Sequence, residues 1–328
     1  MSSSLTSVPS QTASTSNRSD VLDSTPLGSF YIAGIGLWGP SFDSLDSYLD
    51  VAKEFQQDAD PNIELAAPVK PVPKLIPANE RRRAPLAVKA AVSVCEQALA
   101  MSGLSSNELA CVFGSSMGDT DLTDYMCRVL AQDPALLSPT KFHNSVHNAA
   151  AGYWTIASDC QQAANSVAAQ EFTAGMSLFE AASQARYEEQ PVMLALFDTA
   201  VSSSYRSLYD LADSFACALV LIPECDSLRE LTKSLDQNHS ENLKSISKSI
   251  DISVQNSAAS DSRFSKKKIL SNLSAEILPL VNFLYLDSKV DNFSDATDYS
   301  ELMLALSDQS YLCIRKTKTA DSVYTEAR

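Results

Sequence analysis

The sequence is poor in basic residues. Its 25 lysines and arginines are outnumbered by 40 aspartates and glutamates, which gives a formal net charge of −15. A surface this acidic repels the phosphates of nucleic acids and of anionic membranes. The sequence also lacks any run near the roughly 18 apolar residues of a transmembrane helix, and residues 1–20 lack the apolar stretch of a secretory signal. We therefore expect a cytoplasmic protein without nucleic-acid binding or membrane insertion.

Paired cysteines are also lacking. The seven cysteines are an odd number, and none forms a CxxC pair, so neither a zinc ribbon nor a disulfide framework is indicated. Most lie in apolar segments, which favours small, buried, reduced side chains. No metal and no cofactor is predicted. The cysteines are Cys95, Cys111, Cys127, Cys160, Cys217, Cys225 and Cys313.

Glycine is scarce and unevenly placed. All nine glycines lie at or before Gly175, so tight turns and close backbone approaches are expected in the first part of the chain. Composition divides the chain into five parts. These are a disordered Ser/Thr-rich tail (1–28), a packed domain (29–225), a polar insertion or linker (226–270), a helix and strand completing the domain (271–318) and a tail (319–328).

The packed domain alternates short apolar runs with segments of helical periodicity. This alternation predicts an α/β layered domain in which helices cover a sheet. The expected strands are 30–38, 109–116, 165–170, 191–198 and 215–223, and the clearest expected helices are 85–103 and 173–189.

The segment GSSMG at 114–118 fits the nucleophile-elbow pattern GxSxG, with Ser116 as the nucleophile. A hydrolase would then need an acid and a late histidine. Two of the three histidines, His143 and His147, come too early for that order, and His239 lies in the polar segment. A glycine-bounded strand-to-helix turn is the favoured interpretation, and an esterase using Ser116 remains an alternative.

The segment HNSVH places His143 and His147 four residues apart, which on a helix would put them on one face. The zincin pattern needs a glutamate directly after the first histidine, and Asn144 stands there instead. A structural role near a helix start is therefore favoured over a metal site.

Three consecutive arginines, Arg81, Arg82 and Arg83, form a small basic cluster in this acidic chain. They fit either a solvated helix end or a docking patch for an acidic partner, because a local basic patch can steer an acidic protein.

Several motifs resemble the β-ketoacyl synthase-like N-terminal domain family. They are FYIAGIGLWGP, RRRAPLAVKAAVSVCEQALAMSG, VFGSSMGDT and SPTKFHNSVHNAAAGYWTIAS, in this order. The most specific is SVHNAAAGYW, so the motif residues are His143, His147, Asn148 and Gly152. The chain is most similar to short ketosynthase-like or chain-length-factor-type subunits of aryl-polyene-like type II fatty acid and polyketide systems. The resemblance implies one thiolase-like half, a mixed sheet covered by helices.

The chain departs from this family at the catalytic position. The family places a cysteine nucleophile after a short strand, at the start of a buried helix whose dipole favours the thiolate. Matching the strand NSVAAQ and Gly175 to the family pattern puts Phe172 at that position, and Cys160 lies about twelve residues earlier. The family's two catalytic histidines belong to a second half that we expect this chain to lack. The resemblance therefore implies no catalytic residue and no condensation by the chain alone.

A non-catalytic, chain-length-factor-type subunit is the implied function, with an active β-ketoacyl-ACP synthase and an acyl carrier protein as partners. Family members pair through the strand before the nucleophile, so the expected partner interface comprises Ser166, Val167, Ala168, Ala169 and Gln170. Arg81, Arg82 and Arg83 are the candidate carrier-protein docking residues. The alternative is a stand-alone enzyme, either an atypical 3-oxoacyl-ACP synthase or the Ser116 esterase.

Overall fold

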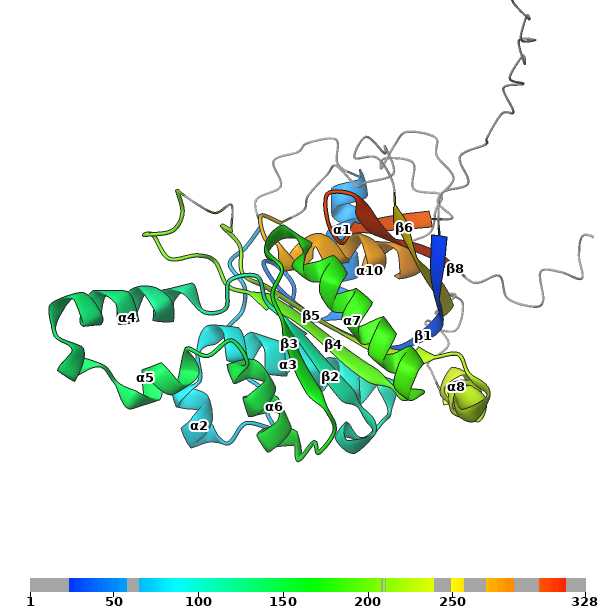
Figure 1. Cartoon of the computed structure of the whole chain (residues 1–328), viewed down its shortest axis with the longest axis horizontal. Helices are drawn as coiled ribbons and strands as arrows, with labels where there is room; N and C mark the ends of the chain where they lie inside the picture. The colour runs from blue at the N-terminus through cyan, green and yellow to red at the C-terminus, as the bar shows by residue number, and fades with distance from the viewer. Residues whose placement is uncertain are drawn as a thin grey trace, which may run out of the picture.

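The computed structural model describes residues 24–57, 65–207, 209, 211–238, 249–256, 270–285 and 301–316. Within them, eight strands form one sheet in the order β3-β2-β4-β5-β1-β6-β8-β7 (Figure 1). The strands are β1 (Ser24–Trp38), β2 (Ala110–Gly114), β3 (Ala164–Val167), β4 (Val192–Asp198), β5 (Phe215–Pro223), β6 (Ser249–Asn256), β7 (Glu301–Ala305) and β8 (Ser310–Lys316).

The helices lie between these strands along the chain. They are α1 (Leu45–Gln57), α2 (Ala78–Arg83), α3 (Leu86–Ser102), α4 (Thr120–Gln132), α5 (Pro139–Asn144), α6 (Ala149–Ser158), α7 (Thr173–Glu188), α8 (Arg229–Asn238) and α10 (Leu278–Tyr285). No described helix has both the length and the apolarity that crossing a membrane requires. The expected α/β class with a mixed sheet is confirmed.

The sheet is mixed because its strands are joined in two ways. Helical crossovers make β3, β2 and β4 parallel neighbours, whereas β5 runs antiparallel to both β4 and β1. The central strands β2, β4 and β5 are buried along their whole length. Burial on both faces explains why their sequences are continuous apolar runs rather than alternating ones.

Helices cover both faces of the sheet. Along β4, Leu194 packs with α1, α7 and α10 on one face, and its neighbour Met193 packs with α3 and α6 on the other. This division follows from the alternation of side chains across a strand. The α4 and α5 helices extend away from these layers (Figure 1).

The glycines of β1 let α3 lie unusually close to the sheet. A Cβ atom added at Gly34 would come within 2.1 Å of the Ala98 carbonyl oxygen, and one at Gly36 within 2.0 Å of the Val94 carbonyl oxygen. No real Cβ fits there, so the GIG part of GIGLWGP is a packing requirement between β1 and α3.

Three segments differ from the boundaries expected from the sequence. The strand β1 begins at Ser24, inside the expected tail 1–28. The expected insertion 226–270 contains α8 and also β6, which pairs with β1 and β8. The C-terminal part supplies a helix and two strands rather than one. Its apolar side chains enter the same core as α7, and the remaining residues of both tails lie outside the described residues.

The close approach of α3 to β1 predicts contrasting effects of two glycine substitutions. Gly34→Ala should lower the free energy of unfolding by about 1–3 kcal/mol, because the new methyl group forces α3 away from the sheet. Gly152→Ala is the matched control, since Gly152 lies within α6 and has no neighbour within 4 Å of the added Cβ. It should raise the free energy of unfolding by about 1 kcal/mol. Urea unfolding measures both, and an equal effect at the two positions would contradict this packing.

Candidate functional site

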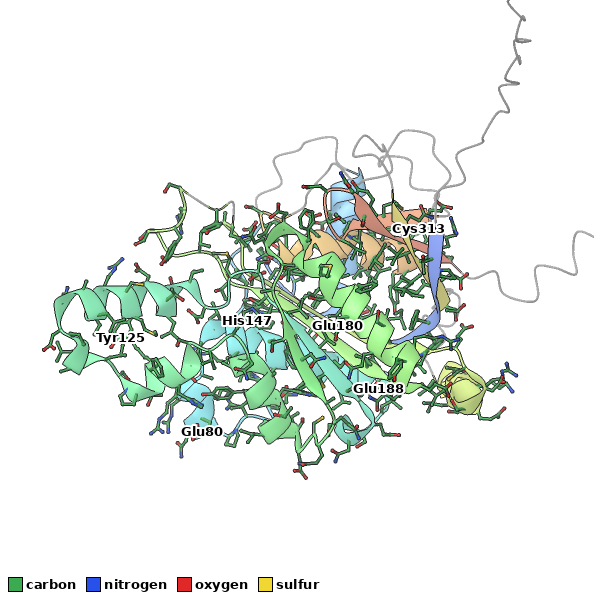
Figure 2. All side chains as sticks on the ribbon, in the orientation of Figure 1. Glu80, Tyr125, His147, Glu180, Glu188 and Cys313 are labelled. Carbon is green, nitrogen blue, oxygen red and sulfur yellow. The ribbon has the colours of Figure 1, made fainter. Side chains whose placement is uncertain are left out.

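The carboxyl ends of the parallel strands β2, β3 and β4 meet at one edge of the sheet. They end at Gly114, Val167 and Asp198, and five residues separate the end of β3 from the start of α7. Such edges hold ligands or catalytic groups in many open α/β sheets. Figure 2 shows His147 where the α4–α5 extension joins this edge.

A buried carboxylate organises this edge. Asp198 is 1% exposed and accepts hydrogen bonds from the Ser115 hydroxyl (2.9 Å) and from the backbone N–H groups of Met117 (3.1 Å) and Ser116 (3.2 Å). The Ser274 hydroxyl, just ahead of α10, donates a fourth bond at 2.5 Å. The Asn272 amide also donates to the Asp198 backbone carbonyl at 3.1 Å. One side chain therefore joins the ends of β2 and β4 to the C-terminal segment.

Burial raises the pKa of the Asp198 carboxyl above its ordinary value. The four hydrogen bonds act in the opposite direction and offset only part of the cost of removing the charge from water. Sequence analysis did not identify Asp198, Ser115 or Ser274. The available signal was an acidic residue closing the apolar run PVMLALFD.

The GSSMG segment is a structural turn. The Ser115 hydroxyl accepts a hydrogen bond from the Gly118 N–H (2.9 Å) while it donates to Asp198, and Gly118 has a φ of +63°. The Ser116 hydroxyl is buried and has no hydrogen-bond partner among the described residues. A serine nucleophile needs an adjacent base. No described histidine forms a hydrogen bond with the Ser116 hydroxyl, so the described residues place no base beside it.

The two histidines of HNSVH do not share a helix face. The α5 helix ends at Asn144, so His143 lies on the helix and His147 in the turn that follows. The Nε2 atom of His147 lies 2.8 Å from the Ser115 carbonyl oxygen, and it must carry the hydrogen because a carbonyl only accepts. The described residues contain no group of three metal-ligating side chains. The bond from His147 to the Ser115 carbonyl joins the turn after α5 to the end of β2.

The rest of the SVHNAAAGYW motif positions α6. Asn148 precedes the first residue of α6, and Gly152 lies in its second turn. Asn144 is 5% exposed, and its amide joins the Arg83 carbonyl (3.4 Å) to the Tyr153 hydroxyl (3.2 Å). Asn144 therefore connects α2, α5 and α6, a role that sequence analysis did not assign to it.

The strand β3 leaves one side of its backbone open. It is the terminal strand of the described sheet, and the carbonyls of Ala163 and Val167 accept hydrogen bonds from β2. Backbone groups alternate in direction along an extended strand. The N–H and C=O groups of Ser166 therefore face the open edge.

The expected strand 165–170 is shorter than predicted. It ends at Val167, so Ala168, Ala169 and Gln170 form a turn instead. Gln170 has a left-handed φ of +50°, and the Thr173 hydroxyl closes the turn by accepting from the Ala169 N–H and donating to the Gln170 carbonyl. These bonds bring the chain directly from β3 into α7.

Phe172 lies at the start of α7. It is the residue preceding the first helical residue, its ring is partly exposed, and no side chain caps this end of the helix. Cys160 is 5% exposed in the loop that leads into β3. Its thiol donates to the Leu109 carbonyl at 3.5 Å, and a hydrogen bond from Cys111 lowers its pKa. Cys160 thus belongs to a buried pair at the opposite end of β3.

The three arginines do not act alike. The Arg81 guanidinium donates to the carbonyls of Pro73 (2.7 Å) and Ile76 (3.2 Å), so it holds the preceding segment in place. Arg82 and Arg83 are exposed, and Arg82 bonds to the Asn79 side chain within the same helix. Of the three, Arg82 and Arg83 are therefore the ones whose positive charges are exposed for contact with a partner.

The Asp198 network predicts a specific sensitivity to loss of its charge. The backbone N–H groups of Ser116 and Met117 bond to different oxygens of the Asp198 carboxylate. In Asp198→Asn an NH2 group replaces one of these oxygens, so one of the two N–H groups loses its acceptor. The free energy of unfolding should fall by about 1–3 kcal/mol. Asp213→Asn is the matched control, because Asp213 receives a single backbone bond from Ser271 that an amide oxygen can still accept. Equal losses in urea unfolding would show that Asp198 does not hold this edge together.

Comparisons with known proteins agree with the arrangement of the sheet. The chain is similar to a chain of the ketosynthase (ApeO) in complex with its chain length factor (ApeC) from Xenorhabdus doucetiae, with 17% identity, a TM-score of 0.60 and coverage of 88% of this chain and 99% of that one. The ishigamide ketosynthase/chain length factor gives 10% identity, a TM-score of 0.57 and coverage of 89% and 100%. At these identities the likeness establishes the fold.

A third similar structure is AntDE:AntF, a type II polyketide acyl-carrier protein in complex with its ketosynthase, with 10% identity, a TM-score of 0.58 and coverage of 88% and 98%. No curated protein sequence matches the chain. The model of the β-ketoacyl synthase N-terminal domain, however, matches residues 54–271, well over half of the sequence. The resemblance expected from the motifs is confirmed, and the chain belongs to the β-ketoacyl synthase N-terminal domain family.

Proposed function

We propose that this chain is a non-catalytic, chain-length-factor-type subunit that pairs with an active β-ketoacyl-ACP synthase in fatty acid or polyketide-type biosynthesis. One observation carries the proposal, namely that Phe172 lies at the start of α7, the position at which the family pattern has its nucleophile. A phenyl ring cannot form a thioester. The start of α7 is formed, but Phe172 stands in place of the cysteine whose thiolate the helix dipole would favour.

The surroundings of Phe172 favour the same function. Decarboxylation of a malonyl thioester needs groups that stabilise an enolate, which in this family are histidines. Of the histidines of this chain, His147 already bonds to the Ser115 carbonyl, and His143 is exposed on α5. His239 lies outside the described residues.

The open edge of β3 supports pairing with a partner. An edge strand with unused N–H and C=O groups is a template for a strand of another chain. The adjacent α6 packs beside β3 and exposes Ile156 to 85%. Further exposed apolar side chains lie on the α4–α5 extension and the turn after it, namely Leu130, Leu136, Phe142 and Val146. Exposed apolar side chains of this kind are suited to a protein contact.

An acyl carrier protein is the second proposed partner. Arg82 and Arg83 are exposed on α2, and Lys141 of the neighbouring α5 lies 3.3 Å from the centre of the Tyr125 ring. These cations form a local basic area on an acidic protein, which suits an acidic partner. The similar AntDE:AntF structure contains a carrier protein bound to its ketosynthase. We propose that the assembly works in the cytoplasm.

The alternative is a stand-alone enzyme. An atypical 3-oxoacyl-ACP synthase would need a nucleophile other than Phe172, and a Ser116 esterase would need a base that the described residues do not place beside Ser116. A decisive experiment incubates the purified chain with malonyl and acyl carrier-protein thioesters, alone and with a ketosynthase from the same source. We expect co-purification with the ketosynthase, no acyl mass on this chain and no decarboxylation without the partner. Turnover by the chain alone would overturn the proposal.

Edge pairing predicts that Ser166→Pro weakens the complex. The Ser166 N–H faces the open edge, so its removal leaves the β2–β3 bonds intact but deletes one donor to the partner strand. Ser166→Ala keeps the N–H and is the matched control. Size-exclusion chromatography with the ketosynthase should show dissociation only for the proline variant, with unchanged circular dichroism of the isolated chain. A stable complex with the proline variant would rule out pairing through β3.

Replacing Phe172 tests whether its ring acts at the interface. Because the ring is partly exposed, Phe172→Ala should cost the isolated chain clearly less than the roughly 3–5 kcal/mol expected for a fully buried phenylalanine. Phe113→Ala supplies that comparison, since Phe113 is 1% exposed in β2. In the reconstituted complex, Phe172→Ala should shift the length distribution of the acyl products, measured by mass spectrometry. An unchanged distribution, with the complex intact, would contradict a role in shaping the acyl pocket.

A further inference from the structure

An open cavity of about 890 Å³ lies between α3 and the extended segment 69–75. Its walls are mainly apolar, from Trp38, Val69, Val72, Leu75, Leu99 and Leu104. The volume is within the range of about 300–1,000 Å³ that small-molecule sites occupy.

The outer wall of this cavity is fixed by hydrogen bonds. The Trp38 indole N–H donates to the Val69 carbonyl at 2.7 Å. The Glu96 carboxylate accepts from the backbone N–H groups of Lys74 (2.9 Å) and Leu75 (2.6 Å). Because both Glu96 oxygens are engaged, this residue holds the wall in place. The cavity is therefore a preformed site.

The apolar side chains of this wall are left open to water. Val69 is 66% exposed, Val72 57% and Leu75 40%. Three exposed apolar side chains within seven residues, held in a fixed extended segment, form a patch that an apolar ligand would cover. The Ser93 hydroxyl, also in the lining, is buried and has no hydrogen-bond partner among the described residues.

Two lysines line the cavity on the segment 69–75, in a chain of net charge −15. Lys70 and Lys74 line it, are exposed, and form no ion pair with any described residue. Lys89 precedes Ser93 by one turn on α3, and burial together with the charge of Lys70 lowers its pKa. The lining also contains two acidic residues, Glu96 and Asp43. The Asp43 carboxylate accepts a hydrogen bond from the Ser47 hydroxyl at 3.5 Å. The segment carrying Lys70 and Lys74 is thus positive.

We propose that this cavity binds a linear hydrocarbon chain that ends in an anionic group, with the chain on the apolar walls and the anion between Lys70 and Lys74. An anion held at an apolar site requires such a counter-charge. The proposal does not depend on the subunit function proposed above. A free fatty acid has this chemistry, whereas an acyl chain on a carrier protein's phosphopantetheine arm ends in a neutral thioester and lacks the anion.

Titration of the full-length chain with decanoate and with decanol tests the charge requirement. Calorimetry should show decanoate binding at least about tenfold more tightly than decanol, because only the carboxylate forms charge-assisted hydrogen bonds with the two lysines. A brominated decanoate should quench tryptophan fluorescence, since Trp38 lines the cavity and the other tryptophan, Trp154, is fully buried elsewhere. Absence of binding, or equal affinity for acid and alcohol, would overturn the proposal.

Variants locate the site. The double variant Lys70→Ala, Lys74→Ala should reduce decanoate affinity about tenfold or more and leave decanol affinity unchanged. Ala100→Trp, at a lining position of α3, should abolish binding of both by filling the cavity. Lys53→Ala is the control, because Lys53 is an exposed lysine of α1 that pairs with Asp50 outside the cavity. Loss of decanoate binding in the control, or its persistence in Ala100→Trp, would place the ligand elsewhere.

Carrier protein tests whether the free acid is the ligand. Binding of decanoate, with no gain in affinity from acylation of the carrier protein, would identify a free fatty acid and support the proposal. Tighter binding of decanoyl-carrier protein than of unacylated carrier protein, without binding of decanoate, would identify a site for a neutral acyl thioester and overturn it. Equal binding of acylated and unacylated carrier protein, together with no binding of decanoate, would identify a protein-docking surface and also overturn it.

Discussion

The buried carboxylate of Asp198 sets the arrangement at the carboxyl end of the sheet. Four donors from the GSSMG turn and from Ser274 converge on it, and each would lose a partner if Asp198 moved. The network therefore holds the end of β2, the end of β4 and the start of the C-terminal segment in one geometry. His147 is positioned by the same turn, since it bonds to the Ser115 carbonyl. The placement of β3 and α7 beside this edge, and thus of Phe172, depends on that geometry.

A second constraint is the contact between α3 and β1. Gly34 and Gly36 let the backbone of α3 lie directly against β1. The segment 69–75 therefore lies along another side of α3 and lines the cavity together with it. Trp38 and Glu96 then hold that segment at a distance that leaves a cavity. The motif GIGLWGP, which helped to indicate the family, therefore also determines where the proposed ligand site lies.

The proposed division of labour within the complex follows from what the fold keeps and what it replaces. The strand, turn and helix start around the nucleophile position are formed, with Thr173 closing the turn and Gln170 in a left-handed conformation. In the proposed function, Phe172 stands where the family pattern has its reactive side chain; its ring is partly exposed, and the neighbouring strand edge of the described sheet is open. These features are the basis of the proposal that the chain completes another subunit's pocket.

The sequence by itself determined the features that depend on neighbouring residues. Apolar runs predicted β4 and β5, helical periodicity ending at Gly103 predicted α3, and the order of motifs identified the family and placed Phe172 at the start of α7. Only the tertiary structure showed that β6 joins the sheet, that HNSVH breaks into a helix end and a turn, and that Asp198 bonds to Ser115 and Ser274. Those bonds join residues 83 and 76 positions apart, and spacing along the chain carries no information about which buried donor a distant carboxylate will meet once the strands are aligned.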